Sequence, residues 1–366
     1  MRIIIVGGSL SGLACALALD RIGHEVVVVE REKALGAGGS GLGVDRRLLS
    51  NTVGISAFGT EQAPPLAVIT TNRDSTAWST IYEWLRQRLN ATSVALTHGE
   101  VNQIVQTPYG ASIQFGAEEL LADAVIGADG YRSVVRRTVN PLKPDARFAG
   151  YMLWRGLVDE DGSPEIASLP LGVPPVGVNW AGEYRLVAYF VPGADGSVQV
   201  GRRRISWAWY DPNRGPLLQA TGCVAGEMVQ HSLTFDQIPT DTRAFLLEKA
   251  KLLWPEPWRT AILRSISYGN CFGTPIAEYL PDSLANGRAA IIGDAAHVSS
   301  PMTGGGFRYA LDDIVALSAV FADARSSSVT TALSAFEEMR LAPSRELASY
   351  SQRWSREYLA GLQHSR

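Results

Sequence analysis

The sequence predicts an α/β protein in which an antiparallel sheet is inserted into a parallel-sheet domain, followed by C-terminal helices. Three observations predict this class. The chain begins with a strand, a glycine-rich turn, a helix and a second strand. Two later stretches repeat the order of apolar strand, polar turn and helix, and the segment between them alternates aromatic and β-branched runs with Gly, Pro and Asp turns. With 366 residues, 46% of them hydrophobic, the chain exceeds one compact core, so two domains are expected.

The first unit spans residues 2–30 and is typical of a dinucleotide-binding fold. A β-branched run at residues 3–6 predicts a buried strand, residues 10–22 carry helical spacing, and residues 26–29 form the next strand. Gly7 permits the tight bend of the GGSLSG turn, and Gly12 lets the helix approach the sheet. The cofactor-binding residues predicted here are Gly7, Gly8, Ser9, Leu10, Ser11, Gly12, Glu30 and Arg31.

The chemistry expected of this turn is phosphate binding by backbone N–H groups at a helix N-terminus. Ser9 replaces the usual middle glycine and is small enough to keep that approach open. Glu30 follows Gly12 by 18 residues, close to the offset at which an acidic residue takes a ribose hydroxyl. The alternative is a plain turn in a parallel sheet.

Two further stretches, residues 123–137 and 289–313, each place backbone donors and a carboxylate at the carboxyl end of a strand. The first contains Asp129 and Gly130, and the second contains Gly293 and Asp294 followed by a proline and a run of glycines. We expect all three turns to contribute to one site.

With these motifs in order, the chain resembles the FAD-dependent aromatic hydroxylases, single-component monooxygenases related to p-hydroxybenzoate hydroxylase. In that family the strand-ending Gly-Asp contacts the ribityl chain of FAD, which Gly293 and Asp294 match. The resemblance links Asp129 and Gly130 to FAD and NAD(P)H. The resemblance also implies that the loop after Gly293 and Asp294 covers the isoalloxazine ring. The matching residues of this loop are Pro301, Gly304, Gly305 and Gly306.

The resemblance is nearest to the 2,6-dihydroxypyridine hydroxylase branch, which shares the serine-containing turn and a GYxxWRG strand at residues 150–156. The chain also departs from the commoner members. Trp78 stands where they place an arginine near the cofactor, and Gly305 and Arg308 replace a Gln and an Asn of the ring-covering loop.

The fold implied is a Rossmann-like FAD-binding domain of the GR2/PHBH type with an inserted substrate domain. Its expected parts are residues 1–59, 77–147 and 268–366 for FAD, residues 60–76 as strands joining the substrate sheet, and residues 148–267 as the antiparallel substrate domain. Residues 332–363 are expected to be helical, with Pro343 separating two segments.

The activity implied is hydroxylation of an electron-rich aromatic or heteroaromatic small molecule, through a flavin C4a-hydroperoxide. FAD is the expected cofactor, O2 the oxidant, and NADH or NADPH the transient electron donor. Two alternatives stay open. One is a flavin oxidoreductase, epoxidase or tailoring enzyme for a non-aromatic substrate, and the other is a non-catalytic FAD-binding scaffold.

Candidate substrate contacts lie in the antiparallel segment. Tyr189, Trp207 and Trp209 are predicted to form an aromatic wall for a flat substrate, with ordinary core packing as the alternative. His297 follows the Gly-Asp turn and is the candidate for proton transfer. Its alternative, which the resemblance favours, is a helix-start residue that contacts backbone or phosphate.

Composition excludes several other classes. With 33 basic and 36 acidic residues and no long charge run, no nucleic-acid or membrane surface is expected. The three cysteines lack metal or disulfide spacing, so no metal site is expected and a reducing, cytoplasmic compartment is indicated. The apolar N-terminus continues into a second strand and is therefore not expected to be a signal peptide. A monomer or a homodimer is expected.

Overall fold

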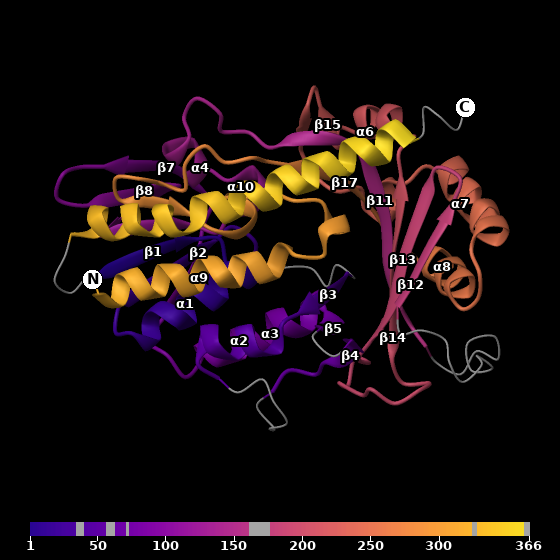
Figure 1. Ribbon diagram of the computed structural model, residues 1–366, viewed down its shortest axis with the longest axis horizontal. Helices are drawn as coiled ribbons and strands as arrows, with labels where there is room; N and C mark the ends of the chain where they lie inside the picture. The colour runs from indigo at the N-terminus through magenta and orange to yellow at the C-terminus, as the bar shows by residue number, and fades with distance from the viewer. Residues whose placement is uncertain (34–39, 56–62, 71–72, 161–175, 324–327, 362–366) are drawn as a thin grey trace.

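The computed structural model describes residues 1–33, 40–55, 63–70, 73–160, 176–323 and 328–361. Two large sheets dominate it (Figure 1). A parallel sheet lies at the N-terminal end of the molecule, an antiparallel sheet stands at the other end, and two long helices, α9 (Gly306–Asp323) and α10 (Val329–Gly361), run across the parallel sheet. The predicted combination of a Rossmann-like domain with an antiparallel sheet domain is confirmed.

The parallel sheet has six strands. Their order is β18 (Ala285–Asn286), β19 (Ala289–Ile291), β10 (Ala124–Gly127), β1 (Arg2–Val6), β2 (Glu25–Glu30) and β6 (Ala95–His98). Only the edge strand β18 runs antiparallel to its neighbour. Since β1 pairs with β2 on one side and with β10 on the other, the strand order reverses at β1. Ligands of open α/β sheets bind at such a point, outside the carboxyl ends of the strands.

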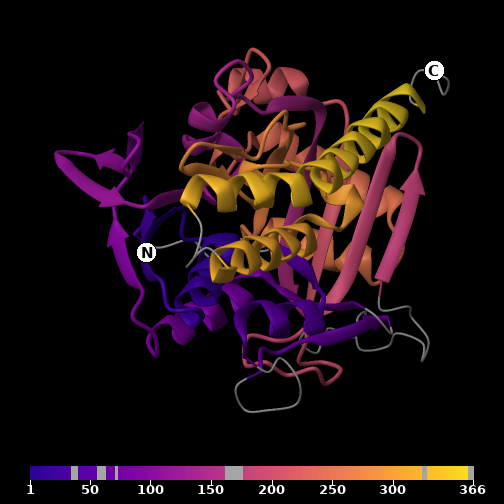
Figure 2. The same ribbon diagram turned by 60° about the vertical axis from the view of Figure 1, so that its left-hand side comes forward.

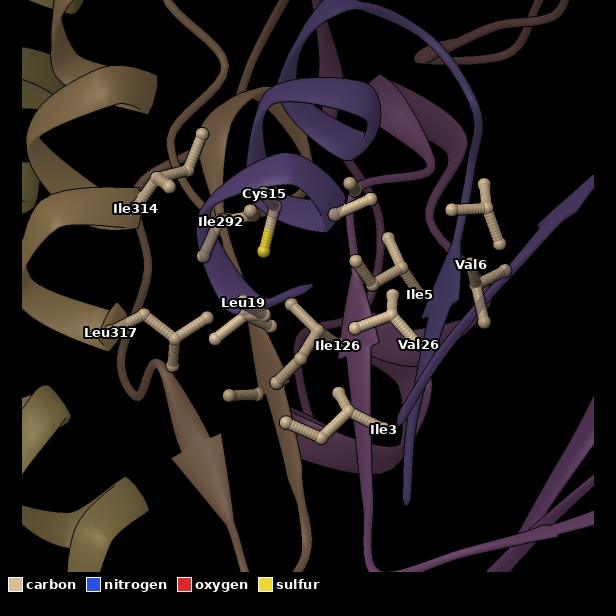
Figure 3. Packing of buried hydrophobic residues seen from close by; sticks show 14 of the residues in the cluster. Ile3, Ile5, Val6, Cys15, Leu19, Val26, Ile126, Ile292, Ile314 and Leu317 are labelled. Atoms are coloured by element: carbon tan, nitrogen blue, oxygen red, sulfur yellow. The ribbon is translucent and has the colours of Figure 1, made fainter. Parts of the chain in front are cut away.

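The core of this domain forms around α1 (Leu10–Arg21), of which nine residues are buried. The helix packs against β1 and β2 on one side and against α2 (Arg46–Val53), α3 (Trp78–Leu89) and α9 on the others. Figure 3 shows Cys15 and Leu19 of α1 among the isoleucines of β1 and β10 and Leu317 of α9. A helix enclosed on all sides has no polar face, which explains its nearly continuous apolar sequence.

The antiparallel sheet has five strands, in the order β12 (Val176–Ala181), β13 (Tyr184–Val191), β14 (Arg204–Asp211), β11 (Arg147–Asp159) and β17 (Cys271–Glu278). Helices α7 (Thr240–Leu253) and α8 (Trp258–Ser267) cover its outer face, and α6 (Gly215–Ala220) lies at one end (Figure 1). The expected boundary at residue 267 is wrong, because β17 follows α8 and still pairs with β11.

Three smaller sheets complete the fold. They are β3 (Gly41–Val44) with β5 (Arg73–Ala77) and β4 (Ala67–Thr70), β7 (Val101–Gln106) with β8 (Ala111–Phe115) and β9 (Glu118–Ala122), and β15 (Val224–Ala225) with β16 (Met228–Val229). Figure 2 shows β7–β9 at the end of the molecule away from the five-stranded sheet. Residues 60–76 were expected to join that large sheet. Their described strands instead form a separate sheet, in which β5 pairs with both β3 and β4, and Ser75 reaches the large sheet by donating its hydroxyl to the Phe190 carbonyl, 2.9 Å away.

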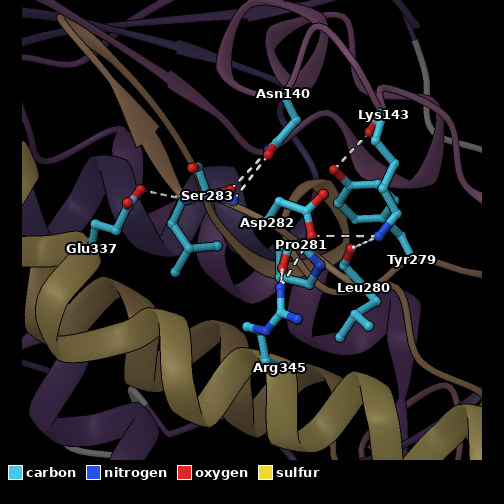
Figure 4. A network of polar contacts seen from close by, with 10 residues as sticks. Asn140, Lys143, Tyr279, Leu280, Pro281, Asp282, Ser283, Glu337 and Arg345 are labelled. Atoms are coloured by element: carbon cyan, nitrogen blue, oxygen red, sulfur yellow. Dashed lines mark hydrogen bonds and ion pairs between the residues drawn. The ribbon is translucent and has the colours of Figure 1, made fainter.

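The C-terminal helix α10 is continuous over 33 residues, with Pro343 inside it. The expected division at Pro343 is therefore wrong. A polar network fastens this helix to the segment before β18, as Figure 4 shows. Glu337 accepts the N–H groups of Leu284 and Ala285, both at 2.7 Å, and Arg345 donates to the Pro281 carbonyl at 2.6 Å. The same segment reaches the end of α4 (Val135–Val139), because Asn140 donates to the Ser283 carbonyl.

Candidate cofactor and substrate site

Four strand ends of the parallel sheet meet at one edge and build the candidate site. β1 ends before Gly7, β2 ends at Glu30, β10 leads into Asp129, and β19 leads into Gly293 and Asp294. The strands run parallel in register, so these turns lie side by side. The three sequence motifs, far apart in the chain, therefore converge as predicted.

The glycines of the first turn have no room for a side chain. Gly7 has a φ of +104°, and a Cβ there would lie 2.4 Å from the Ala128 carbonyl oxygen. A Cβ on Gly12 would lie 1.8 Å from the Gly7 carbonyl oxygen. Helix α1 thus begins directly on the strand end, and the Ser9 side chain does not cap it. Its first N–H groups remain available for an anion.

Glu30 holds the shape of this turn. Its carboxylate accepts the Gly8 N–H at 2.6 Å and the Glu32 N–H at 2.9 Å. The Gly8 N–H was expected to face a phosphate, and in this structure it is instead taken by Glu30. The prediction of phosphate-facing donors therefore stays for the N–H groups of the following residues, at the start of α1.

Asp129 has one occupied and one open carboxylate oxygen. Its Oδ2 accepts the N–H of Val134 at 2.7 Å and of Val135 at 3.3 Å, which caps α4. Its Oδ1 is buried and has no partner among the described residues. Burial raises the pKa of this carboxyl, although the hydrogen bonds to it lower that pKa. A buried oxygen without a partner is costly, so it suits a ligand that donates a hydrogen bond.

The third turn packs against the first. Gly293 has a φ of +56°, and a Cβ on it would lie 2.8 Å from the Ser11 hydroxyl of α1. Asp294 is exposed to the adjoining cavity. Arg136 joins this turn to the second motif by donating to the carbonyl oxygen of Ala295 at 3.0 Å and to that of Tyr131.

One cavity of about 640 Å³ opens between these turns. Predicted cofactor residues that line it are Gly7, Ser9, Ser11, Glu30, Arg31, Asp129, Gly130 and Asp294. The others lie around it. Gly8, Leu10, Gly12 and Gly293 shape the turns from behind, and Leu10 buries its side chain in the core. The volume lies within the range of ligand sites in proteins.

These residues fit the adenosine diphosphate part of FAD and the ribityl chain that follows it. The start of α1 offers N–H donors to a pyrophosphate, the carboxylates of Glu30 and Asp294 can accept hydrogen bonds from ribose or ribityl hydroxyls, and Asp129 Oδ1 can accept one more hydrogen bond. Pro301, Gly304, Gly305 and Gly306 lie outside the cavity, in the loop before α9, and their contact with the isoalloxazine ring stays a prediction.

His297 lies behind the third turn and is fully buried. Its Nε2 is 2.6 Å from Asp313 Oδ2 on α9, and Asp313 also accepts the Gly293 N–H and the Arg340 Nε–H. Burial alone would lower the pKa of His297, but the charge and hydrogen bond of Asp313 outweigh burial and raise it. The imidazole thus supports the Gly-Asp turn, and its part in proton transfer stays a prediction that this burial does not favour.

Trp207 and Trp209 face away from the cofactor domain. They share a buried cluster with Trp254 and Trp258 at the α7–α8 layer. Trp209 packs edge to face against Trp254, with 5.4 Å between the ring centroids. Gly156 leaves space for this cluster, since a Cβ there would lie 2.8 Å from Trp207 Nε1. The prediction that both tryptophans contact substrate is wrong, and core packing explains them.

Tyr189 lies on the opposite face from the tryptophans. It pairs with Ser206 of β14, whereas Trp207 pairs with Ala188, so a one-residue offset separates the two faces. A Cβ on Gly41 would meet the Tyr189 hydroxyl at 2.4 Å, and Ser206 Oγ accepts the Gly41 N–H at 2.7 Å. Tyr189 therefore stands where the sheet meets β3 of the cofactor domain, and its substrate contact stays a prediction.

The face of the sheet that turns towards the cofactor domain has its own aromatic cluster. Its buried members are Tyr151, Leu153, Tyr210 and Ile276 of the sheet and Tyr358 of α10. Met302, from the loop after the third turn, packs on this cluster. This loop therefore runs from the cofactor cavity to the aromatic face. Sequence reasoning did not single out this cluster, although strand alternation would have placed Tyr151 on the face opposite Trp154.

A pair of variants separates the two faces. Trp207→Ala should lower the free energy of unfolding by about 3–5 kcal/mol, because it removes a fully buried indole. Tyr189→Phe should lower it by about 1 kcal/mol or less. Urea unfolding followed by circular dichroism measures both. A Trp207→Ala protein of unchanged stability would contradict this assignment of the faces.

Other features of the described residues bear on function. No helix among them is both long and apolar enough to cross a bilayer, and they contain no group of three or more His, Cys, Asp or Glu residues placed to hold a metal. Cys15, Cys223 and Cys271 are all buried free thiols. Burial raises the pKa of the Cys271 thiol to about 12, which disfavours the reactive thiolate.

Three family models match parts of the chain. Residues 2–42 match a model described as pyridine nucleotide-disulphide oxidoreductase, residues 148–252 one described as FAD binding domain-like, and residues 260–351 one described as FAD binding domain. The first covers β1, the glycine turn, α1 and β2, and the last covers the Gly-Asp turn and its loop. These matches agree with FAD as the cofactor.

Individual relatives extend the comparison to most of the chain. The 2,6-dihydroxypyridine 3-monooxygenase of Paenarthrobacter nicotinovorans is 27% identical over 342 residues, which cover 87% of this chain and 82% of the relative. The solved structure of 2,6-dihydroxypyridine-3-hydroxylase from Arthrobacter nicotinovorans has a TM-score of 0.78 at 23% identity, with 98% of this chain and 92% of that chain covered. Klebsiella pneumoniae HpxO, solved with FAD and uric acid, has a TM-score of 0.72 at 20% identity, covering 97% and 88%.

Proposed function

We propose that this chain, which is similar to FAD-dependent aromatic hydroxylases, is an FAD-dependent monooxygenase that hydroxylates a small, electron-rich aromatic or heteroaromatic ring. NADH or NADPH is the electron donor and O2 the oxidant in this proposal. A hydroxypyridine or hydroxybenzoate is the substrate class to test first, since 2,6-dihydroxypyridine and 3-hydroxybenzoate are named in the activities of relatives.

The observation that carries the proposal is the course of the chain after the third turn. Asp294 lines the cofactor cavity, and eight residues later Met302 packs on the aromatic face of the five-stranded sheet. The same loop thus connects the cofactor cavity with a face of tyrosines that suits a flat ring. Tyr189 and Ser206 stand at the junction of that face with β3.

The chain's own residues would bind the cofactor, orient it and enclose its reacting end. The start of α1 and the carboxylates of Glu30 and Asp294 would hold FAD, which would take a hydride from NAD(P)H and transfer one oxygen atom of O2 to the ring. Asp129 Oδ1 would accept a hydrogen bond from it. The loop after Ser300 would cover the reacting end and keep water away, which limits wasteful peroxide release.

Asp294→Ala tests the cofactor half of the proposal. The variant should fold and lose FAD, with affinity at least about tenfold weaker, because a carboxylate facing the cavity is removed while no buried contact is lost. Flavin absorbance of the purified protein and fluorescence titration of the apoprotein measure this. Glu32→Ala, at the rim of the same cavity and paired on the surface with Arg31, is the matched control.

The reaction half is tested by NAD(P)H oxidation and O2 uptake with a panel of hydroxypyridines, hydroxybenzoates and salicylate. We expect slow oxidation by the protein alone and much faster oxidation with the right ring, together with a hydroxylated product. Stimulated NAD(P)H oxidation without O2 uptake would instead favour an oxidoreductase. Bound FAD with no turnover on any compound would favour a scaffold, and a colourless protein that binds no FAD would remove the proposal.

A further inference from the structure

A closed ring of buried hydrogen bonds surrounds Ser300, the residue before Pro301. One arm runs from Glu278 Oε1 of β17 to the Ser351 hydroxyl at 2.6 Å, and from Ser351 Oγ to the Ser300 N–H at 2.7 Å. The other arm runs from Glu278 Oε1 to the Ser355 hydroxyl at 2.8 Å and on to the Tyr151 hydroxyl at 3.0 Å. A hydrogen bond of 2.6 Å between the Tyr151 and Ser300 hydroxyl oxygens closes the ring.

The ring joins three separate elements at one point of the chain. Glu278 comes from β17, the two serines lie one helical turn apart on α10, and Tyr151 comes from β11. Ser300 is held by both its N–H and its hydroxyl oxygen, and that oxygen also accepts the Met302 N–H at 3.2 Å. The position of the first turn of the loop is thereby set by groups outside the loop.

All members of the ring are removed from water. Tyr151 is 1% exposed, Ser300 and Ser351 are fully buried, and Glu278 is 9% exposed. Among the described residues no cation lies within 4.0 Å of the Glu278 carboxylate; burial raises its pKa, although the hydrogen bonds of Ser351 and Ser355 and the charge of Arg356 lower that pKa. A buried carboxyl without a salt-bridge partner costs stability that an apolar residue would not, and such groups concentrate at functional sites.

We propose that Glu278 is a positioning residue, which fixes Ser300 and the following loop for the reaction. It touches neither the loop nor the cofactor cavity and acts through the two serines and Tyr151. The inference rests on the proposed function, because the loop is taken to cover the reacting end of the cofactor. A loop held from two sides excludes water from the site, whereas a loosened loop admits it and diverts reduced cofactor to hydrogen peroxide.

The test cuts each arm separately. Tyr151→Phe removes only the hydroxyl of one arm, Ser351→Ala removes the other, and Glu278→Leu removes the acceptor of both. Tyr279→Phe is the matched control, since it deletes a buried tyrosine hydroxyl next to Glu278 that donates to the Lys143 carbonyl, outside the ring.

The first measurement is hydrogen exchange of the segment 299–306 in the FAD-free protein. Loss of one hydrogen bond should make exchange there about fivefold faster in Tyr151→Phe and Ser351→Ala, and faster still in Glu278→Leu. The second is peroxide released per NAD(P)H consumed by the FAD-loaded protein. We expect it to rise about threefold in the three variants and to stay unchanged in Tyr279→Phe.

The two measurements separate this inference from the proposed function. Unchanged exchange in Tyr151→Phe and Ser351→Ala would overturn the inference, as would an equal change in Tyr279→Phe. Faster exchange with an unaltered share of peroxide would also overturn it, because the ring would then serve stability alone. Faster exchange in a protein that hydroxylates no compound would instead remove the proposed function and, with it, the reaction that Glu278 is said to serve.

Discussion

Replacing Gly12 by alanine is expected to destroy the cofactor site with the addition of a single methyl group. The new Cβ would lie 1.8 Å from the Gly7 carbonyl oxygen, so α1 must move away from the end of β1. Since α1 is buried on all sides, it has no direction in which to move freely. We expect a loss of about 3 kcal/mol or more in the free energy of unfolding. FAD affinity should fall about 100-fold in any protein that still folds.

Gly215→Ala is the control for this variant. Gly215 begins α6, its φ is not positive, and no atom outside its immediate chain neighbours lies within 4 Å of its Cβ position. Alanine there should leave unfolding and FAD binding unchanged. Urea unfolding and flavin fluorescence titration compare the two proteins. A Gly12→Ala protein that matches Gly215→Ala would show that close contact between α1 and β1 is not what forms the turn.

Asp313→Asn should be nearly as damaging, although it lies behind the cofactor cavity. The carboxylate is fully buried between His297 and Arg340 and accepts the Gly293 N–H. Its loss leaves two cationic groups without their counter-charge, which costs about 3–5 kcal/mol. The Gly-Asp turn should loosen and FAD should dissociate faster. Asp312→Asn, the same change at the neighbouring, partly exposed position, should cost less than about 1 kcal/mol.

The same pair predicts a pH dependence of stability. Burial alone would raise the pKa of Asp313, but the charges of His297 and Arg340 and the hydrogen bonds to the carboxylate lower it. The ionised Asp313 therefore stabilises the fold above about pH 4, and this stabilisation is lost as the pH falls through the lowered pKa. The pKa of His297 is raised, so its contribution is complete below about pH 6.5 and is lost as pH rises through the raised value.

Stability of the parent protein should therefore decline on both sides of a plateau, and the alkaline decline should disappear in Asp313→Asn. Unfolding free energies measured between about pH 2 and pH 9 check this. An identical alkaline slope in both proteins would mean that His297 is not stabilised in its charged form.

The parts of the fold that follow from local pattern were predictable. The β-branched runs, the glycine turn and the spacing to Glu30 placed the first unit, and the three turns at strand ends placed the cavity. Each depends on neighbouring residues and on one general property of parallel sheets. The resemblance to a flavoprotein family supplied the cofactor and the reaction class, which local pattern alone does not specify.

The faces of the antiparallel sheet were not predictable in this way. Alternation shows that Trp207 and Trp209 share a face, but not which layer covers it. The covering layer consists of α7 and α8, which begin 29 or more residues after the end of β14 and bring Trp254 and Trp258 to the outer face. The pairing of Tyr189 with Ser206 and not with Trp207 is set by the length of the hairpin between them.

The buried charges were missed for a similar reason. Asp313 lies at helical spacing from the apolar Ala310 and Leu317 of α9, which is a local sign that this carboxylate is buried and has a partner. His297 and Arg340 come from 16 residues before and 27 residues after it. Glu278 likewise meets Ser351 only because α10 returns across β17.

The continuity of α10 restricts how the two halves of the molecule can move. At 1.5 Å per residue its 33 residues form a rod about 50 Å long. Glu337 fastens one end of the rod to the nucleotide-binding half, while Ser351 and Tyr358 fasten the other end to the antiparallel half. Opening the halves like a clamshell would break the rod, and its weakest point is Pro343, which lacks a backbone donor. Entry of substrate and release of product must therefore depend on movements of short connecting segments between two halves that keep their relative orientation.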